Sequence, residues 1–198
     1  MFLSGYKKSR NIMIPIIAQK NPGISPHEHG LQLLNTVIKK LYPDLGRYKI
    51  VKGENGKPHV AEKPEFHYNI SHSRDWTVMA VSGSEIGIDI QYIRPMKSGI
   101  EKRFYTRREN LFLESLPANE RIVASTKMWT LKEAAVKAIG ESLAKRLKEL
   151  DTIAYDGTWS PIILGQYVYT IPFPDIDYIL SCAAAVSIES DYHLTILK

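Results

Sequence analysis

Hydrophobic residues recur along this chain at two spacings, which together predict a protein of mixed α+β class. Between residues 26 and 41 they recur at steps of three and four, the spacing of one face of a helix. Short runs of β-branched and aromatic residues predict strands at 12–17, 47–51, 66–70, 76–82, 86–90, 151–155, 167–171, 178–187 and 192–197. The three runs between residues 66 and 90 are separated by short polar turns, so we expect them to form a meander.

Two further helical regions are predicted in the second part of the chain. Residues 100–116 have a helical pattern, and another helix is expected over residues 119–139, with Asn119 as its N-cap and Gly140 at its C-terminal stop. The segment 95–99 contains proline and glycine and is the best candidate boundary. We therefore predict two units, residues 1–96 and 97–198, each with one helical region and several strands.

The charge and cysteine content narrow the classes of partner and compartment. The net charge of +5 and the pI of about 9.1 favour anionic partners, but the basic residues are scattered rather than grouped, which does not favour dedicated nucleic-acid binding. A single cysteine, Cys182, excludes a disulfide framework within the chain. We find neither the pattern of a signal peptide nor an apolar run long enough to span a membrane, so we expect a cytoplasmic protein.

A carboxylate stands within an apolar strand at Gly87-Ile88-Asp89-Ile90. Alternation along a strand places Ile88 and Ile90 on one face and Asp89 on the other. A buried carboxylate needs an ionic partner or a metal. The alternative is an exposed aspartate on a sheet with one solvated face.

A second carboxylate shares a helix face with an aromatic ring and a lysine. Trp129, Glu133 and Lys137 follow one another at four-residue spacing. The alternative is a solvated Glu–Lys pair, but Trp129 argues against a wholly solvated face. Because Mg²⁺ binds one or two carboxylates together with substrate phosphate oxygens, we predict that Asp89 and Glu133 form one Mg²⁺ site for a diphosphate-containing substrate.

Two shorter segments carry groups that suit phosphate. Asn69-Ile70-Ser71-His72-Ser73 gathers small polar donors and an imidazole at a strand end, and Gly56-Lys57-Pro58 restricts a lysine between glycine and proline. The chain has no G-x-S-x-G elbow, so a serine hydrolase is not favoured. His27 and His29 have a chelating spacing, but we expect both to be surface histidines.

Taken in order, these four segments resemble the motifs of the 4′-phosphopantetheinyl transferases, in particular the larger, monomeric Sfp-like type. The similarity covers roughly residues 56–143, and the last two motifs are specific in combination. The resemblance implies transfer of the phosphopantetheine arm of coenzyme A onto a serine of an acyl or peptidyl carrier protein. It also implies a pseudo-dimer of two similar α/β halves. Each half would be a small, mostly antiparallel sheet packed with a long helix, with the active site between the halves.

The resemblance assigns roles to individual residues. Asp89 and Glu133 are the expected Mg²⁺ carboxylates. His72 and Lys137 are expected to contact the phosphates of coenzyme A, with Lys137 also stabilising charge during the reaction. Lys132, beside the metal ligand, is expected to contact the diphosphate.

Four further residues follow from the same resemblance. Lys57 and Pro58 are expected near the adenine and 3′-phosphate end of coenzyme A, and Ser71 near that same phosphate. The segment 103–109 resembles the family's segment that ends in a glutamate, which makes Glu109 the expected general base for the carrier serine. The N-terminal region does not align with the family's contacts to coenzyme A, and apart from the resemblance Arg10 and His29 are the candidates there.

One departure from the family pattern concerns the metal site. Many relatives carry an acidic residue two positions after the aspartate, where this chain has Gln91. Its amide oxygen can still ligate Mg²⁺, with less charge, so Gln91 is the expected third ligand. The alternatives left open are a relative with weak or no catalysis that binds coenzyme A or a carrier, another Mg²⁺-dependent phosphotransferase and, more distantly, an RNA-binding domain.

Overall fold

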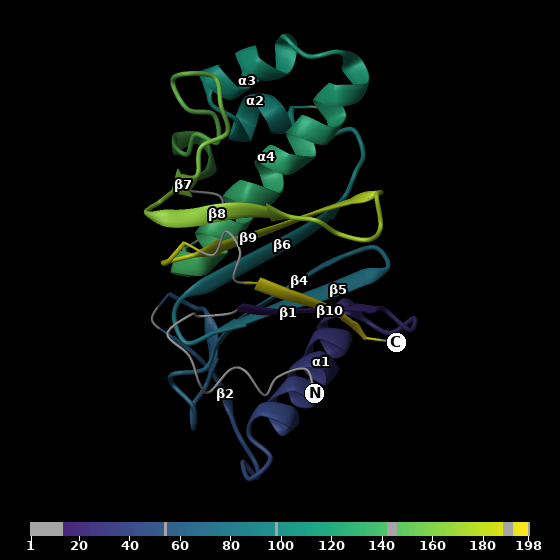
Figure 1. Cartoon of the computed structure of the whole chain (residues 1–198), viewed down its shortest axis with the longest axis vertical. Helices are drawn as coiled ribbons and strands as arrows, with labels where there is room; N and C mark the ends of the chain where they lie inside the picture. Colours follow the sequence, from purple (N-terminus) through teal and green to yellow (C-terminus); the bar gives the residue numbers. More distant parts are fainter. Residues whose placement is uncertain (1–13, 54, 98, 142–145, 188–191, 198) are drawn as a thin grey trace.

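The computed structural model describes residues 14–53, 55–97, 99–141, 146–187 and 192–197, and Figure 1 shows its elements. The helices are α1 (Pro26–Leu41), α2 (Ile100–Phe104), α3 (Arg107–Glu114), α4 (Ala118–Ile139) and the 3-10 turn η1 (Leu147–Glu149). The strands are β1 (Ile14–Lys20), β2 (Ile50–Lys52), β3 (Pro58–Val60), β4 (His67–Ser73), β5 (Trp76–Ser82), β6 (Ile86–Tyr92), β7 (Ile162–Ile163), β8 (Gln166–Ile171), β9 (Tyr178–Ala184) and β10 (Tyr192–Leu197).

The elements stack in four layers, in the order α1, first sheet, second sheet and α4 (Figure 1). The first sheet has the order β10-β1-β5-β4, the second the order β6-β9-β8-β7, and β2 and β3 form a separate hairpin. The β1–β10 pair is parallel and the other pairs are antiparallel. The mixed α+β class is therefore confirmed. No helix within the described ranges is both long and apolar enough to cross a membrane.

Strand pairing crosses the predicted boundary at residues 96 and 97 in both directions. β6 precedes that boundary but pairs with β9, and β10 follows it but pairs with β1. The division into residues 1–96 and 97–198, and the similarity of the two halves, stay predictions.

Apolar side chains fill each of the three spaces between the layers. The space between the sheets is lined by apolar residues of both, among them Ile16, Val78, Ala80, Ile86, Ile88, Ile90, Leu180 and Cys182. The stripe of α1 packs on the outer face of the first sheet through Leu33, Leu34, Val37 and Ile38. α4 covers the second sheet with its small residues, Ala134, Ala135 and Ala138. A long helix therefore covers the outer face of each sheet.

The predicted meander is wrong, because β6 leaves its neighbours in sequence and joins the other sheet. β4 and β5 do form an antiparallel hairpin, but β6 pairs with β9. β6 nevertheless lies beside β4, and side chains of β4 accept hydrogen bonds from its backbone. Alternation along a strand determines which face is apolar, but it carries no information about which neighbour the strand pairs with.

Three other local predictions differ from the structure. The helical region 100–116 is interrupted, because Thr106 caps α3 through a capping box with Glu109. Asn119 lies inside α4, whose N-cap position is Pro117, whereas Gly140 does end the helix in the left-handed region, with φ of 72°. The run 151–155 forms an isolated bridge from Ile153 rather than a strand.

β6 and α4 approach each other so closely that one residue between them must lack a side chain. A Cβ atom on Gly87 would lie 2.0 Å from the carbonyl oxygen of Ala134 and 2.5 Å from the amide nitrogen of Ala138. Both obstacles are helix backbone, which a rotamer change cannot move. Glycine at position 87 therefore sets the distance between the strand and the helix.

Gly87→Ala should accordingly lower the free energy of unfolding by about 3 kcal/mol or more, because β6 and α4 must separate to admit the methyl group. Chemical denaturation measures the change. Gly83→Ala is the matched control, since a Cβ there meets nothing within 4 Å. Equal, small losses for the two variants would contradict this account of the contact.

Candidate active site

Asp89 of β6 and Glu133 and Lys137 of α4 form a cluster of two carboxylates and one ammonium group. Lys137 Nζ lies 2.6 Å from Asp89 Oδ1 and 3.9 Å from Glu133 Oε2. Asp89 is only 1% exposed and Glu133 6%. The predicted alternation is confirmed, since Ile88 and Ile90 face the space between the sheets while Asp89 faces α4. The exposed-aspartate and solvated-pair alternatives are therefore wrong for these residues.

The charges of this cluster are not balanced by Lys137 alone. Burial and the charge of Asp89 raise the pKa of Glu133 and Lys137 opposes the shift, with a net value of about 7. Lys137 also donates to the carbonyl oxygen of Ile88 at 3.4 Å, so its charge is shared with a backbone acceptor. Glu133 therefore binds a proton more readily than an ordinary glutamate does.

The donor set of the cluster suits a hard divalent cation. Two carboxylates are present, and the amide of Gln91 lies beside them, with its nitrogen 3.4 Å from Asp89 Oδ2. A cation would relieve both the burial and the mutual repulsion of the carboxylates, which are the causes of the shifted pKa of Glu133. Among the described residues no group of three or more His, Cys, Asp and Glu side chains forms a metal cluster. Any metal here would therefore be held by two carboxylates, an amide and non-protein ligands.

The polar segment of β4 divides between two faces. Ser71 is buried and donates to Asp89 Oδ1 at 2.7 Å, so it belongs to the carboxylate cluster. His72 is exposed on the opposite face and lines a groove of about 380 Å³ between α1 and β4. His27 and Pro58 line the same groove. Adjacent residues of a strand face opposite ways, so one site cannot receive both side chains.

Lys57 joins three parts of the chain. Its ammonium group pairs with Glu85 and donates to the carbonyl oxygens of Ile86, at 3.0 Å, and Ala138, at 2.8 Å. Its pKa is lowered, chiefly by burial, with Glu85 opposing the shift. Lys57 thereby ties the β2–β3 hairpin to β6 and to the end of α4, and it also lines a second cavity of about 380 Å³.

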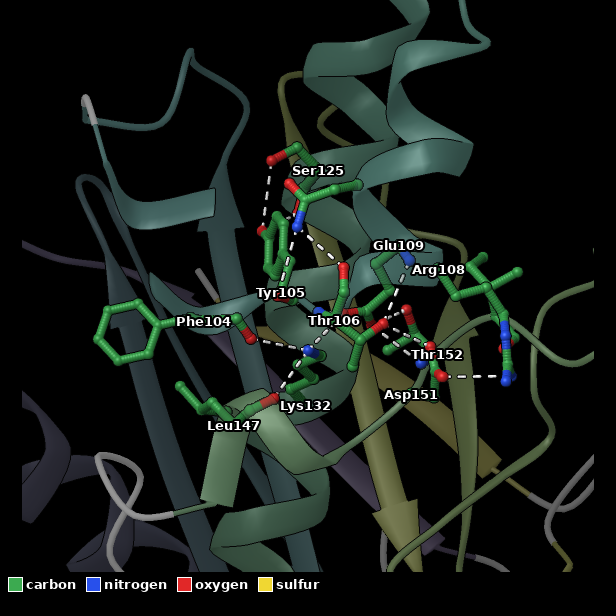
Figure 2. A network of polar contacts seen from close by, with 12 residues as sticks. Phe104, Tyr105, Thr106, Arg108, Glu109, Ser125, Lys132, Leu147, Asp151 and Thr152 are labelled. Carbon is green, nitrogen blue, oxygen red and sulfur yellow. Dashed lines mark hydrogen bonds and ion pairs between the residues drawn. The ribbon is translucent and has the colours of Figure 1, made fainter. Parts of the chain in front are cut away.

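Glu109 and Lys132 form a separate, fully buried ion pair, shown in Figure 2. The side chains of both are 0% exposed, and Lys132 Nζ lies 2.5 Å from Glu109 Oε2. Lys132 also donates to the carbonyl oxygens of Phe104 and Leu147, at 2.9 and 2.8 Å. Glu109 accepts from Thr152, from its backbone nitrogen at 2.9 Å and its hydroxyl at 2.6 Å.

The Glu109–Lys132 pair is separate from the Asp89 cluster. Lys132 and Glu133 are neighbours on α4 but face different sides of the helix. Lys132 contacts Glu109, whereas the carboxylate partners of Lys137 are Asp89 and Glu133. The pair instead links α3, α4 and the segment around η1. In this structure Glu109 and Lys132 hold helices together.

A cleft of about 270 Å³ opens beside the cluster, at the end of β6. Gln91 and Trp129 line it, together with Arg94 and Lys97. Trp129 lies one helical turn before Glu133, as the four-residue spacing predicted. The cleft therefore adjoins the cluster through Gln91 and carries two basic side chains, although Asp89 and Glu133 do not line it.

Residues 85–195 match the family model of the 4′-phosphopantetheinyl transferase superfamily, which is more than half of the chain. The chain belongs to this superfamily. Asp89, Glu109, Glu133 and Lys137 all fall inside the matched stretch, whereas Lys57, Ser71 and His72 precede it.

Individual relatives agree with this membership. The chain is 37% identical over 116 residues to the 4′-phosphopantetheinyl transferase psf-1 of Bacillus pumilus, covering 58% of this chain and 50% of the relative. It is 33% identical over 113 residues to Sfp of Bacillus subtilis (strain 168), covering 57% and 50%. It is 35% identical over 112 residues to HetI of Nostoc sp., covering 54% and 47%. The chain spans about half the length of these relatives.

Two features of this superfamily member were missed by reading its sequence. The capping box of α3 is present as Thr106 and Glu109, a T-x-x-E pattern, and it signals that Glu109 has a structural partner. His29, expected on the surface, is 1% exposed, and its ring nitrogens lie 2.8 Å from Thr77 Oγ1 and 3.1 Å from Gln19 Oε1. The sequence showed no partner for it. Arg10 lies outside the described residues.

Removing one member of the Glu109–Lys132 pair should cost about 3–5 kcal/mol of unfolding free energy, because a buried charge is left unpaired. Glu109→Ala and Lys132→Ala should each show this loss in chemical denaturation. The double variant Glu109→Gln/Lys132→Met should lose less than the sum of the two. Glu141→Ala is the control, because its pair with Arg146 is solvent-exposed, and it should change stability by less than about 1 kcal/mol.

The raised pKa of Glu133 should appear as a pH dependence of stability without added divalent cations. Its carboxyl has a usual pKa of 4.5 and a folded value of about 7. Between these values the folded protein holds more protons than the unfolded chain, so stability falls as pH rises through this window. Glu133→Gln should flatten that fall in denaturation series at several pH values. Glu120→Gln, on the exposed first turn of α4, should leave the slope unchanged.

Proposed function

We propose that this chain transfers the 4′-phosphopantetheine group of coenzyme A to a serine of an apo acyl or peptidyl carrier protein, releasing 3′,5′-ADP. The observation that carries the proposal is the buried Asp89–Glu133–Lys137 cluster, which lies inside the stretch matched by the family model. Relatives named as 4′-phosphopantetheinyl transferases support the same reaction, although the chain spans about half their length.

Mg²⁺ is the proposed cofactor, and Asp89, Glu133 and the amide oxygen of Gln91 are the groups that would hold it. When bound, the ion would neutralise negative charge on a diphosphate. Carboxylate and amide oxygens are its preferred protein ligands, and coenzyme A would contribute phosphate oxygens.

Lys137 is proposed to serve the diphosphate and the leaving group. Its ammonium group lies among the carboxylates and its side chain is 24% exposed, so it can reach a ligand placed over the cluster. In the reaction, a bond forms between the serine oxygen and the phosphorus of the phosphopantetheine. The bond from that phosphorus to the bridging oxygen of 3′,5′-ADP breaks. An ammonium group near that oxygen stabilises the developing negative charge.

The groove lined by His72 and Pro58 is the proposed seat of the nucleotide end of coenzyme A. His72 is exposed there and can donate to a phosphate. Lys57 lines the adjoining cavity, but Glu85, Ile86 and Ala138 already accept its three ammonium protons, so it would have to release one of them before it could bind a phosphate. The contacts of Ser71 and Lys132 in this structure are to protein groups, so their phosphate contacts stay predictions with no geometric support.

A serine hydroxyl is a poor nucleophile near neutral pH and needs a proton acceptor. Glu133 does not suit this role when it holds Mg²⁺, because the cation would remove the causes of its raised pKa. We propose Glu109, the base that the family resemblance suggests. Both of its carboxylate oxygens already accept hydrogen bonds, so it would have to break them before it could accept a proton.

The partner side of the proposal follows from charge. The chain carries a net charge of +5, and Arg94 and Lys97 line the cleft beside the cluster. An acidic carrier protein would be attracted to this face, which raises the rate of encounter. We propose a cytoplasmic monomer that acts on coenzyme A and a carrier, without a nucleic-acid or membrane partner.

The direct test incubates the protein with coenzyme A, Mg²⁺ and several apo carrier proteins. We expect a carrier to gain the mass of a phosphopantetheine group, with equimolar release of 3′,5′-ADP. Asp89→Ala, Glu133→Ala and Lys137→Ala should each lower the rate by about 100-fold or more, since each removes a charged group from the cluster. A variant that kept the wild-type rate would remove its residue from the proposed machinery.

Gln91 supports one second candidate, a family member that binds coenzyme A or a carrier with little or no transfer. Its amide contributes less negative charge to the cluster than a carboxylate would. Calorimetry with coenzyme A separates the two functions, because heat of binding without any 3′,5′-ADP indicates the binding protein. Release of 3′,5′-ADP without modification of a carrier indicates a different phosphotransferase.

A further inference from the structure

The edge of β6 that faces away from β9 forms its hydrogen bonds with side chains of β4 rather than with another strand. β6 is the terminal strand of the second sheet, so alternate backbone N–H groups point away from β9. The amides of Ile88, Ile90 and Tyr92 donate to side-chain oxygens of Asn69, at 2.9 Å, Ser71, at 3.3 Å, and Ser73, at 3.0 Å, respectively. Three residues at two-residue spacing on β4 thus satisfy three amides at the same spacing on β6.

The central member of this series makes additional contacts. The hydroxyl of Ser71 donates its proton to Asp89 Oδ1 at 2.7 Å and accepts from Lys137 Nζ at 3.3 Å, besides accepting from Ile90. A serine hydroxyl has one proton and two lone pairs, so these three bonds use its full capacity. Ser71 is 5% exposed and cannot exchange these partners for water without a rearrangement.

Ser71 therefore fixes the orientation of one carboxylate oxygen. The donors to Asp89 Oδ1 are Ser71 and Lys137, and the side chain of Lys137 is the more exposed of the two. The Ser71 hydroxyl is anchored by a backbone amide of β6 itself, one residue after Asp89. This bond holds the hydroxyl beside the carboxylate.

We propose that Ser71 is a positioning residue: held by its hydrogen bond to β6, it orients the Asp89 carboxylate for the divalent cation. Hydrogen-bonded partners of metal-binding carboxylates commonly change metal affinity by about 10- to 100-fold. The inference rests on the metal site of the proposed function. It differs from the phosphate role that the family resemblance suggests for Ser71, because the serine acts through Asp89 and does not touch the substrate.

Ser71→Ala and Ser73→Ala form a matched pair for the test. Each removes one hydroxyl that accepts from a β6 amide, but among the described residues Ser71 and not Ser73 bonds to Asp89. Isothermal titration of the full chain with MnCl₂ and with MgCl₂ measures cation affinity without a substrate. We expect Ser71→Ala to weaken binding about 10-fold or more, and Ser73→Ala to stay within about twofold of wild type. Denaturation should show that both variants are folded under the conditions of the titration, with the larger loss for Ser71→Ala, which removes more hydrogen bonds.

A second pair keeps the test decisive if Ser71→Ala does not fold. Ser71→Thr and Ser71→Val have nearly the same shape and differ in the hydroxyl, so the threonine variant should bind the cation more tightly than the valine variant. Three results would each overturn the inference while the metal site stands. They are equal affinity for wild type and Ser71→Ala, equal losses for Ser71→Ala and Ser73→Ala, and equal affinity for the threonine and valine variants. Absence of cation binding by the wild-type protein would remove the metal site, and the inference with it.

Discussion

The close approach of β6 to α4 is the constraint on which the rest of this structure depends. At Gly87 the strand meets the helix backbone with no room for a Cβ atom. Two residues further along the strand, Asp89 is held against the helix face that carries Glu133 and Lys137. A wider separation would let water between the carboxylates and remove the cause of the raised pKa of Glu133. The strand–helix distance thus determines both packing and electrostatics.

Polar groups that burial would otherwise leave unsatisfied connect the two sheets. The amides on the free edge of β6 donate to side chains of β4, and its carbonyl groups at Ile86 and Ile88 accept from Lys57 and Lys137. A buried sheet edge without such partners would cost free energy for every unpaired group. Because Ser71 and Lys137 also contact Asp89, two of these side chains also organise the candidate site.

Two lysines of α4 form ion pairs that suit different roles. Lys132 and Glu109 are a one-to-one pair whose own ammonium and carboxylate atoms all have hydrogen-bond partners, which suits a structural role. Lys137 faces two carboxylates and is partly exposed, so its surroundings keep an excess of negative charge and access to ligands. The number of opposing charges and the access of solvent separate the two pairs, although both lysines belong to the same motif of the sequence.

The sequence alone determined the features that depend on residues close together in the chain. Apolar spacing and the cap at Gly140 placed α1 and the end of α4, and strand alternation put Asp89 opposite Ile88 and Ile90. The order of motifs supplied the superfamily, which the family match confirms. Only the tertiary structure decided that β6 pairs with β9 and that Glu109 pairs with Lys132. It also decided that Ser71 contacts Asp89 instead of lining the groove with His72. Those outcomes depend on contacts between residues far apart in the chain, whose pairing a local pattern of polar and apolar residues does not encode.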